Sequence, residues 1–385
     1  MIRRRIFESE HEMFRTSVGR WADDVLVPHR EEWLAAGSVS REAWKSAGEN
    51  GFLCMWAGEE YGGAGMSDYR FDQILIEEIT WREPGFFIHL HNRVIGPYLG
   101  KFATAEQKGR FMPGIVSGDT ILAIGITEPG AGSDVAGLRC FAEEKVDHWV
   151  LNGTKTYISN GLLADLVVVA ARTDRDNPYS MGLFLVERGM EGFSRGSGLK
   201  KLGLKSQDTA ELFFDNVKVP KENVLGDPAK AFKYMMVGLA EERLTGAVSY
   251  VARAERAFAI TLDYITERKA FGRPIGTFQN SRFKMAEMRT RIDACWAFVD
   301  HCTLEHLDGE LSAETAAQAK LLTSETEGQV VDDCLQLHGG AGYMDEYEIS
   351  RLYADARISR IYAGTSEIMK EIIGRNLGLD ERRKG

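Results

Sequence analysis

Several features that would restrict the function are missing from this sequence. No uninterrupted run approaches the ~20 apolar residues of a membrane span, and the longest apolar stretch, 162–171, is broken by Asp165. Basic residues form no stripe, and the formal net charge of the 385 residues is −10 at pH 7. An acidic chain of this kind is a poor partner for nucleic acid. We therefore expect a soluble protein that binds neither membranes nor nucleic acid.

The five cysteines form no C-x-x-C pair, and their number is odd. The segment Met1–Arg5 is basic, but glutamates follow at once, and no apolar segment of a secretory signal comes after it. We therefore expect reduced thiols in a reducing compartment, either the cytoplasm of a bacterium or, after processing, the mitochondrial matrix of a eukaryote. His89 and His91 lie close together in sequence, but no metal-ligand spacing accompanies them, so we expect no bound metal.

Length and hydrophobic periodicity together predict several domains. A single hydrophobic core stops growing at about 250–300 residues, so a chain of 385 residues needs more than one. Apolar residues recur at spacings of three and four from residue 6 to about residue 120, then the pattern changes to strands, and helical spacing returns after Asp227-Pro228. The predicted fold is α+β, with an N-terminal helical domain at 1–120, a middle β domain at 121–225 and a C-terminal helical domain at 226–385.

Individual elements can be placed within these domains. We predict strands at 121–126, 149–151, 166–170, 182–186 and 211–219, the last with Asp215-Asn216 as turn formers. Long helices are expected at 231–270, 278–308, 311–339 and 366–376. The glycine-rich segment 61–67 is interpreted as a loop that ends on Ser67 as a helix N-cap. Cys295 and Cys302 lie on one helix face, which favours burial in a core over a redox pair.

The segment Ile121–Asp134, ILAIGITEPGAGSD, joins an apolar strand to a loop rich in hydroxyls and glycine. Gly130 and Gly132 let the backbone approach a ligand and take φ values closed to other residues. Thr127 and Ser133 add hydroxyls that can donate or accept hydrogen bonds. Such a loop can hold a planar polar ligand, because its peptide N–H groups can meet carbonyl oxygens of that ligand.

Four further segments occur in order along the chain: YISNG at 157–161, RKAFG at 268–272, QLHGG at 336–340 and IYAGTSEI at 361–368. Together with the 121–134 segment they resemble the acyl-CoA dehydrogenase family, and the likeness runs from residue 6 to residue 372. Within the family, LAEERL at 239–244 and the ending at 362–371 are most similar to the long-chain acyl-CoA dehydrogenases. The resemblance implies a helical domain, a central β domain and a C-terminal four-helix domain, in that order.

The resemblance also implies that the chain binds FAD. No G-x-G-x-x-G fingerprint follows a strand, so we do not expect the dinucleotide to bind in a Rossmann-type site. By family likeness, Tyr157 stacks on the flavin ring, where most members have tryptophan, and Ser159 places its hydroxyl near the reactive nitrogen. Plain strand packing is the alternative role for Tyr157. The residues expected at this part of the cofactor are Ile124, Thr127, Ser133, Tyr157, Ile158 and Ser159.

A second group of residues is expected to reach the diphosphate and adenosine of an FAD bound to a neighbouring subunit. By resemblance these are Arg268, Phe271, Gln279, Gln336, Gly339 and Gly340. The guanidinium of Arg268 can donate two hydrogen bonds to phosphate oxygens, although a cation at a helix end could also only offset the helix dipole. Thr365 and Glu367 would complete the FAD shell, although Thr365 could be only a helix N-cap. If these roles carry over, the chain must oligomerise, and the family pattern suggests a homotetramer.

The catalytic base of this family is not at its usual place in this chain. In most members a glutamate precedes the last Gly-Thr, and here that position is Ala363, whose methyl group cannot take a proton. Long-chain and isovaleryl enzymes carry the base on an earlier helix, one residue before an arginine, and the matching residue here is Glu242, before Arg243. A carboxylate with a raised pKa in a dry site could remove the weakly acidic α-proton of an acyl thioester as the flavin accepts hydride from the β-carbon.

Glu241 stands directly before Glu242, and neighbours on a helix point roughly 100° apart. We therefore expect only one of the two to face the flavin and the other to be solvated. Surface charge is the usual role of such a helical Glu-Glu-Arg, but the missing glutamate at position 363 favours Glu242 as the base, with Glu241 as the fallback. Arg243 could position the CoA moiety or could only pair with a neighbouring acid.

The resemblance assigns substrate contacts to Ser133, Arg243, Tyr362, Ala363 and Gly364. The thioester carbonyl is expected to accept hydrogen bonds from the main-chain N–H of Ala363 and from a ribityl hydroxyl of FAD. Isovaleryl enzymes have glycine where this chain has Tyr362, and a tyrosine leaves less room for a branch. We therefore expect dehydrogenation of a straight medium- to long-chain acyl-CoA to trans-2-enoyl-CoA, with electrons passed to electron-transfer flavoprotein.

Other activities on the same fold remain open. A branched-chain acyl-CoA dehydrogenase would use the same base, and an acyl-CoA oxidase would return electrons to O₂. A flavin monooxygenase would have no need for Glu242. A non-catalytic flavoprotein of this fold is the last alternative.

Overall fold

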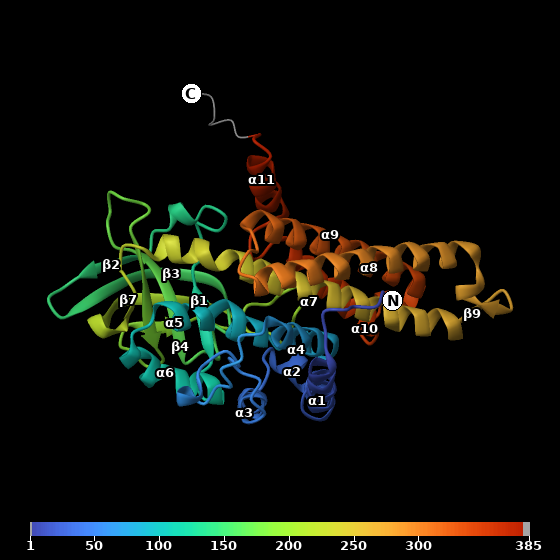
Figure 1. The fold of residues 1–385 in the computed structure, drawn as a ribbon, viewed down its shortest axis with the longest axis horizontal. Coiled ribbons are helices and arrows are strands. Elements are labelled where there is room, and N and C mark those ends of the chain that lie inside the picture. The colour runs from blue at the N-terminus through green and yellow to red at the C-terminus, as the bar shows by residue number, and fades with distance from the viewer. Residues whose placement is uncertain (1, 380–385) are drawn as a thin grey trace.

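The computed structural model describes residues 2–379, in which a sheet region lies beside a bundle of long helices and shorter N-terminal helices pack against both (Figure 1). Within the N-terminal helical region, a π-helical turn, η3 (Leu90–Ile95), leads directly into the helix that begins at Gly96. This order of helices, sheet and helices confirms the predicted α+β fold, while the domain boundaries at 120 and 225 stay predictions. The N-terminal helices are α1 (Ser9–Val25), α2 (Arg30–Ala36), α3 (Arg41–Glu49), α4 (Tyr69–Arg82), α5 (Gly96–Phe102) and α6 (Ala105–Ser117).

Eight of the strands in the described residues form a mixed sheet in the order β6-β7-β3-β2-β4-β5-β8, with β1 beside β4. Every residue of β4 except Arg172 is buried, and so is every residue of β5 except Glu187. Such continuous apolar runs belong at the centre of a sheet that is covered on both faces. The strands are β1 (Leu122–Gly125), β2 (Phe141–Glu144), β3 (His148–Ser159), β4 (Leu166–Arg172), β5 (Met181–Glu187), β6 (Phe193–Arg195), β7 (Thr209–Pro220) and β8 (Val224–Leu225).

Strand β7 runs without a break through Asp215-Asn216, so the prediction of a turn there is wrong. Asn216 instead has a left-handed φ of 53°, and its N–H donates to the side chain of Asn152 at 2.9 Å. The register between β3 and β7 shifts at this point, between Leu151 and Gly153. A β-bulge therefore accommodates a residue that tolerates the left-handed region without ending the strand.

The long C-terminal helices are present where the periodicity predicts them, each within a few residues. After α7 a short hairpin of β9 (Lys269–Ala270) and β10 (Arg273–Pro274) begins, so α7 ends at 267 and not at 270. The additional helix α10 (Glu348–Ala356) is too short to stand out by periodicity alone. The long helices are α7 (Ala231–Glu267), α8 (Gln279–Leu307) and α9 (Ala313–His338), followed near the end of the chain by α11 (Ser366–Asn376).

The N-cap of α4 lies one residue later than predicted. Asp68, and not Ser67, caps the helix, and its carboxylate accepts a hydrogen bond of 2.9 Å from the N–H of Arg70. Both residue types make good caps. Asp68 has the further advantage of an ion pair with the Arg70 guanidinium at 2.7 Å.

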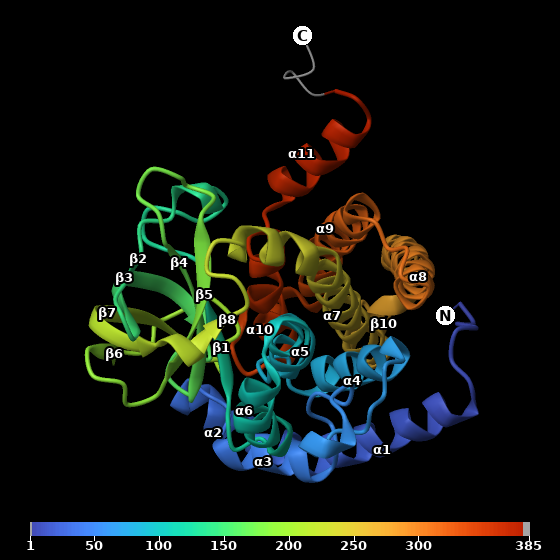
Figure 2. The ribbon, with the colours of Figure 1, turned by 60° about the vertical axis from the view of Figure 1, so that its left-hand side comes forward.

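Helix α7 runs through the middle of the helical region and packs against α4, α8 and α9 (Figure 2). Every residue from Arg243 to Glu255 is buried. Charged residues in such a helix need partners, and Arg253 donates to Glu327 at 2.5 Å and to the Ser359 hydroxyl at 2.9 Å. The middle of α7 is therefore enclosed by the bundle, while its N-terminal end lies near α5 and the sheet.

All five cysteines are buried and free. Cys295 and Cys302 belong to the hydrophobic core of the helix bundle, which confirms the predicted core role of this pair. Among residues 2–379, the helices are either too short or too polar to cross a membrane.

Candidate active site

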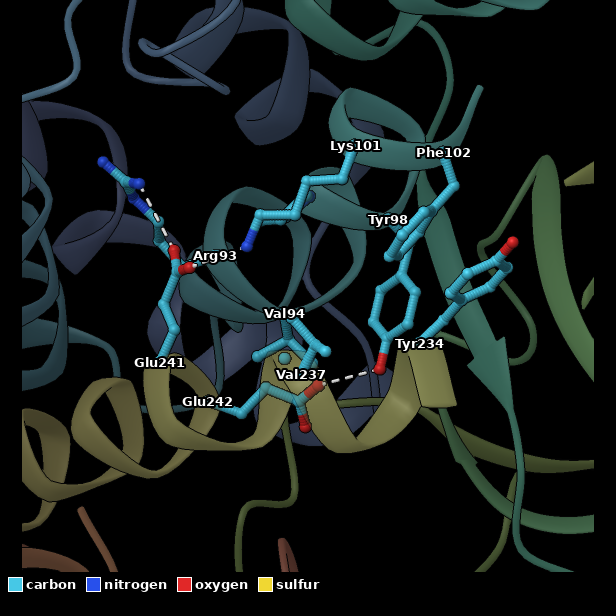
Figure 3. Close-up of a pocket in the computed structure, with 11 residues that line it drawn as sticks. Arg93, Val94, Tyr98, Lys101, Phe102, Tyr234, Val237, Glu241 and Glu242 are labelled. Atoms are coloured by element: carbon cyan, nitrogen blue, oxygen red, sulfur yellow. Dashed lines mark hydrogen bonds and ion pairs between the residues drawn. The ribbon is translucent and has the colours of Figure 1, made fainter. Parts of the chain in front are cut away.

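Glu241 and Glu242 of α7 point in different directions and have different partners (Figure 3). Glu241 accepts a hydrogen bond of 3.3 Å from Arg93 and lies 3.5 Å from the Nζ of Lys101. The Oε1 of Glu242 accepts a hydrogen bond of 3.1 Å from the hydroxyl of Tyr98. Glu241 is only 8% exposed, so the expectation that one of the two is solvated is wrong. Glu241 thus lies beside two cations, of which Arg93 also pairs with Asp72 and Lys101 reaches it from a half-exposed position.

A small pocket surrounds the carboxylate of Glu242, and its wall contains apolar side chains from η3, α5 and α7. Burial raises the pKa of Glu242 to about 7, against the opposing hydrogen bond from Tyr98. The charge of Arg243 also lowers this pKa, whereas the charge of Glu241 raises it. A carboxyl group with such a pKa can take up and release a proton near neutral pH, as a general base must.

Two successive residues near the end of the chain have a left-handed backbone: Ala363 with φ 52° and Gly364 with φ 89°. For alanine this region is sparsely populated and needs support from the surrounding structure. The Nζ of Lys320, on α9, donates a hydrogen bond of 2.7 Å to the carbonyl of Gly364. The side chain of Lys320 is buried, and burial together with the charge of Arg243 lowers its pKa to about 8. Helix α9 thus holds the turn that carries the N–H of Ala363.

Tyr362 is fixed between two aromatic residues. Its ring centroid lies 5.9 Å from that of Tyr250 and 6.5 Å from that of Phe87. Tyr250 follows Glu242 on α7 by about two helical turns, or about 12 Å. The segment before Ala363 is thereby anchored to the same buried helix that carries the predicted base.

Arg243 is 4% exposed and donates a hydrogen bond of 3.3 Å to the carbonyl of Ala313. Within residues 2–379 the charge of one carboxylate, that of Glu242, acts on Arg243 without a hydrogen bond between the two, so the alternative of pairing with a neighbouring acid also stays a prediction. Burial lowers its pKa, and the charge of Glu242 opposes that effect. The predicted role of Arg243 toward CoA stays a prediction.

In the sheet region, Tyr157 lies on a β-bulge of β3. The register with β7 shifts between Lys155 and Ile158, and Tyr157 has a left-handed φ of 59°. Its side chain is 70% exposed, so Tyr157 is not packed into the strand interior. The N–H of Thr156 donates to the carbonyl of Thr127 at 2.9 Å, which joins the bulge to the 127–133 loop. The bulge therefore turns an aromatic ring outward beside that loop.

Buried charge supports the 127–133 loop. The carboxylate of Glu128 accepts hydrogen bonds from the N–H groups of Arg139 and Cys140 and pairs with the Nζ of Lys155 at 2.8 Å. Gly130 and Gly132 do not have left-handed φ values, so that part of the expectation is wrong. A Cβ on either glycine would meet no other protein atom within 4 Å. The glycines therefore leave the loop open on its outer side for a close approach.

The other predicted residues of this region take varied positions. Ser133 is exposed, Thr127 and Ser159 are half-buried, and so is Ile124 on β1, whereas Ile158 is buried opposite Ala210 of β7. The side chain of Ile158 therefore supports the bulge from inside, and only its main chain can contribute to a surface site.

The second predicted group lies at the opposite end of α7. Helix α7 has 37 residues and is therefore about 55 Å long; it begins near the sheet and ends at the β9–β10 hairpin (Figure 1). The ring of Tyr264 stacks on His338 at 4.3 Å, which joins this end of α7 to the end of α9. Phe271, at the hairpin tip, is 96% exposed. The residues gathered here, all exposed, are Arg268, Phe271, Gln279, Gln336, Gly339 and Gly340.

Thr365 caps α11, and its hydroxyl accepts a hydrogen bond from the N–H of Ile368 at 3.3 Å. The alternative role of Thr365 as an N-cap is thereby confirmed, and its role toward FAD stays a prediction. Glu367 is exposed in the first turn of the same helix.

Several residues of this site cannot be recognised from the sequence. Tyr98 lies 144 positions before Glu242, and Lys320 lies 44 positions before Gly364. Neither belongs to a motif, and a lysine inside a helical pattern usually faces solvent. Among residues 2–379, no three histidine, cysteine or acidic side chains come together as metal ligands.

Comparison with known proteins assigns the class. Three family models match successive parts of the chain: the acyl-CoA dehydrogenase N-terminal domain at residues 8–119, the middle domain at 123–217 and the C-terminal domain at 230–378. The chain belongs to the acyl-CoA dehydrogenase family, whose members are FAD-dependent oxidoreductases that act on CH–CH bonds.

Individual relatives cover nearly the whole chain. It is 44% identical to the mitochondrial long-chain specific acyl-CoA dehydrogenase of Mus musculus, over 98% of this chain and 88% of that protein. It is 35% identical to the mitochondrial isovaleryl-CoA dehydrogenase of Oryza sativa subsp. japonica, over 98% of this chain and 93% of that protein.

Solved structures agree with this assignment. An acyl-CoA dehydrogenase from Geobacillus kaustophilus is 42% identical, with a TM-score of 0.95 over 97% of this chain and 99% of that one. A glutaryl-CoA dehydrogenase from Mycobacterium smegmatis, in complex with FADH2, is 28% identical, with a TM-score of 0.91 over 97% of this chain and 95% of that one. The likeness to long-chain acyl-CoA dehydrogenases, expected from LAEERL at 239–244, is confirmed.

The residues of this chain fit a flavin dinucleotide. The outward ring of Tyr157 offers an apolar face, and the open 127–133 loop beside it can bring main-chain N–H groups close to a polar ring edge. The exposed guanidinium of Arg268 suits a diphosphate. The sheet that carries Tyr157 and the hairpin beside Arg268 lie at opposite ends of α7 (Figure 1).

Proposed function

We propose that this protein is an acyl-CoA dehydrogenase that converts a straight medium- to long-chain acyl-CoA to trans-2-enoyl-CoA. The observation that carries the proposal is the environment of Glu242, a carboxylate in a small pocket whose wall combines apolar side chains with Arg93, Lys101 and Glu241, and whose pKa is raised to about 7 by burial. Ala363, at the usual position of the base, cannot serve. A chain that had lost the reaction would have no reason to keep a carboxylate in so costly a place.

In this proposal Glu242 removes the proton from the α-carbon of the thioester. The N–H of Ala363 donates to the thioester carbonyl and stabilises the negative charge that develops there. Lys320 holds that N–H in place through its hydrogen bond to the carbonyl of Gly364. Bound FAD supplies the acceptor for the hydride that leaves the β-carbon. Arg243 and Ser133 contact the substrate.

The preference for a straight chain rests on Tyr362. Its ring is held between Tyr250 and Phe87, so it cannot easily move aside for a branch next to the reacting carbons. A branched acyl-CoA is the alternative substrate, because an isovaleryl-CoA dehydrogenase is among the similar proteins. The similarity to long-chain enzymes supports a medium to long acyl chain.

The arrangement of the FAD residues supports an oligomer. Tyr157 and the 127–133 loop would hold the flavin, while Arg268 and Phe271 of a second copy would reach the diphosphate and adenosine, with Gln279, Gln336, Gly339 and Gly340. The two groups lie toward opposite ends of α7, a helix of 37 residues and about 55 Å, which supports the use of two copies for one FAD. We infer a homotetramer by family likeness, electron-transfer flavoprotein as the electron acceptor, and a place in the bacterial cytoplasm or in the mitochondrial matrix.

The test is anaerobic reduction of the bound flavin by a panel of acyl-CoAs, short to long and straight to branched. The proposal expects bleaching of the flavin that is fastest with straight medium or long chains. If isovaleryl-CoA bleached the flavin fastest, the substrate would be a branched acyl-CoA and not a straight one. No bleaching by any thioester, in protein that holds FAD, would overturn the proposal in favour of a monooxygenase or a non-catalytic flavoprotein.

The electron acceptor is tested separately. Reduced protein is mixed with either electron-transfer flavoprotein or O₂, and the return of the yellow colour is followed. Faster reoxidation by O₂ would indicate an oxidase.

A further inference from the structure

The hydroxyl of Tyr98 is the only group within residues 2–379 that forms a hydrogen bond with the carboxylate of Glu242 (Figure 3). The bond joins Oη to Oε1 at 3.1 Å. The second carboxylate oxygen, Oε2, accepts no hydrogen bond from the described residues. The carboxylate is therefore held through one oxygen, while the other is left to take a proton.

Tyr98 is placed by the local backbone of the N-terminal region. The π-helical turn η3 (Leu90–Ile95) passes directly into α5, and Gly96-Pro97 forms the first turn of that helix. Tyr98 follows on the face that packs toward α7, and its side chain is 4% exposed. A phenol at such a position can move little, so its hydroxyl is a fixed point for the flexible side chain of Glu242.

Gly238 makes room for this contact. It lies one turn before Glu242 on α7, and a Cβ there would come within 3.2 Å of the Glu242 Oε1 and 3.4 Å of the Tyr98 hydroxyl. The contact with the Tyr98 hydroxyl is an ordinary one, whereas the contact with Oε1 would displace the Glu242 carboxylate by a few tenths of an ångström. The space for the hydrogen bond is thus formed by the absence of a side chain at position 238, on a helix where alanine would otherwise be preferred.

We propose that Tyr98 is the positioning residue of the catalytic base, and that its hydroxyl holds Oε1 so that Oε2 of Glu242 faces the α-proton of the substrate. The inference rests on the proposed function of Glu242. Tyr98 itself touches neither substrate nor flavin in this account. It remains a neutral donor throughout, because burial and the neighbouring carboxylate raise its pKa well above its usual value. The α-proton ends on Oε2, and the phenolic proton stays on Tyr98.

The charged groups around Glu242 define what removal of this hydroxyl should do. Lys101 of α5 and Arg243 of α7 favour the ionised carboxylate, whereas Glu241 and burial disfavour it. The hydrogen bond from Tyr98 acts with the two cations. Its loss therefore raises the pKa of Glu242 further, and the base is protonated over a wider range of pH.

The experiment compares wild type with Tyr98→Phe in anaerobic flavin reduction by a fixed straight-chain acyl-CoA, across pH. We expect the acid limb of the rate to move by about one to two pH units to higher pH, and the rate at saturating substrate and neutral pH to fall about 10- to 100-fold. The substrate concentration at half-saturation should stay unchanged within about threefold, because Tyr98 does not bind the substrate. The proposal would be overturned if the acid limb of the pH–rate profile and the rate of flavin reduction at saturating substrate were both equal to those of wild type.

Tyr69→Phe is the matched control. Tyr69 is also buried, and its hydroxyl contacts Thr245 of α7 at 3.0 Å, three residues beyond Glu242. This variant removes a buried phenolic hydroxyl against the same helix without touching the base, so its acid limb should equal that of wild type. A shift as large as that of Tyr98→Phe would mean a general packing effect and would also overturn the proposal.

Two further variants keep the test decisive. Gly238→Ala should reduce the rate by crowding the hydrogen bond, with normal FAD content, even if Tyr98→Phe folds poorly. Glu242→Gln separates the two hypotheses: if it bleaches as fast as wild type, the proposed function fails. If Glu242→Gln is inactive while Tyr98→Phe and Gly238→Ala behave as wild type, only the role of Tyr98 fails.

Discussion

The Nζ of Lys320 donates a hydrogen bond of 2.7 Å to the carbonyl of Gly364, from a side chain that is buried in the helix bundle. Lysine is rarely buried in this way unless its ammonium group has a partner. The carbonyl that it binds belongs to the turn in which Ala363 and Gly364 both have left-handed backbones. Lys320 therefore stabilises a strained turn at the predicted substrate carbonyl.

Replacement of Lys320 by methionine keeps the length of the side chain and removes the donor. We expect the flavin reduction rate to fall about 10- to 100-fold, because small displacements of reacting groups have effects of this size. The FAD content should remain normal. Stopped-flow reduction of the flavin checks the rate, and a rate within twofold of wild type would show that the turn does not need Lys320.

The pH dependence of catalysis should follow the ionisation of Glu242. Its pKa is raised to about 7, and only the ionised form can accept the α-proton. The rate of flavin reduction should therefore fall about tenfold per pH unit below pH 7 and level off above it. A pH profile that is flat between pH 5 and 9 would be incompatible with Glu242 as the base.

The same raised pKa costs stability at high pH. A glutamate whose folded-state pKa lies above its unfolded value stabilises the folded state at pH values below the unfolded pKa, and this contribution is lost as pH rises through about 7. Glu242→Gln cannot ionise, so we expect it to be more stable than wild type at pH 8, by on the order of 1–3 kcal/mol, and about equally stable near pH 4.5. Thermal unfolding at both pH values measures this, and a variant less stable at pH 8 would contradict it.

Glu241→Gln should behave differently from Glu242→Gln. Glu241 is bound by Arg93 and Lys101, so it is not free to act as the base, and we expect flavin reduction within about tenfold of wild type. Because the charge of Glu241 raises the pKa of Glu242, the acid limb should move to lower pH. A loss of about 10²–10⁴-fold, the size expected for removal of a general base, would instead identify Glu241 as the base.

FAD affinity should depend on Arg268 at the far end of α7. If its guanidinium binds the diphosphate in a neighbouring subunit, Arg268→Ala should weaken FAD binding about 10- to 100-fold. Lys269→Ala removes the neighbouring exposed charge and serves as the control. Titration of apoprotein with FAD measures both, and equal affinity in the two variants would contradict the role of Arg268.

The sequence predicts the parts of this fold that depend on local pattern. The long helices α7, α8 and α9 follow from apolar spacing, and the central strands follow from continuous apolar runs. Predictions failed where a tertiary contact decides the outcome. Asn216 is a turn former by itself, but pairing with β3 keeps it in a bulge, and Glu241 appears solvated until Arg93, from 148 positions earlier, is brought beside it.

The candidate site shows the same division. Glu242 could be proposed from a motif and from the absence of a carboxylate at 363, because both are visible in the sequence. Tyr98 and Lys320 could not, because their roles arise only when α5 and α9 pack against the rest of the fold. The left-handed backbone at Tyr157 is likewise produced by the β3–β7 pairing.

The most direct test of the central claim moves the base. Anaerobic flavin reduction by a straight-chain acyl-CoA is measured for wild type, Glu242→Gln and the double variant Glu242→Gln/Ala363→Glu. The account predicts that Glu242→Gln loses about 10²–10⁴-fold of the rate, with FAD still bound, and that the carboxylate at position 363 restores part of the loss. A Glu242→Gln variant that reduces its flavin at the wild-type rate would contradict the account.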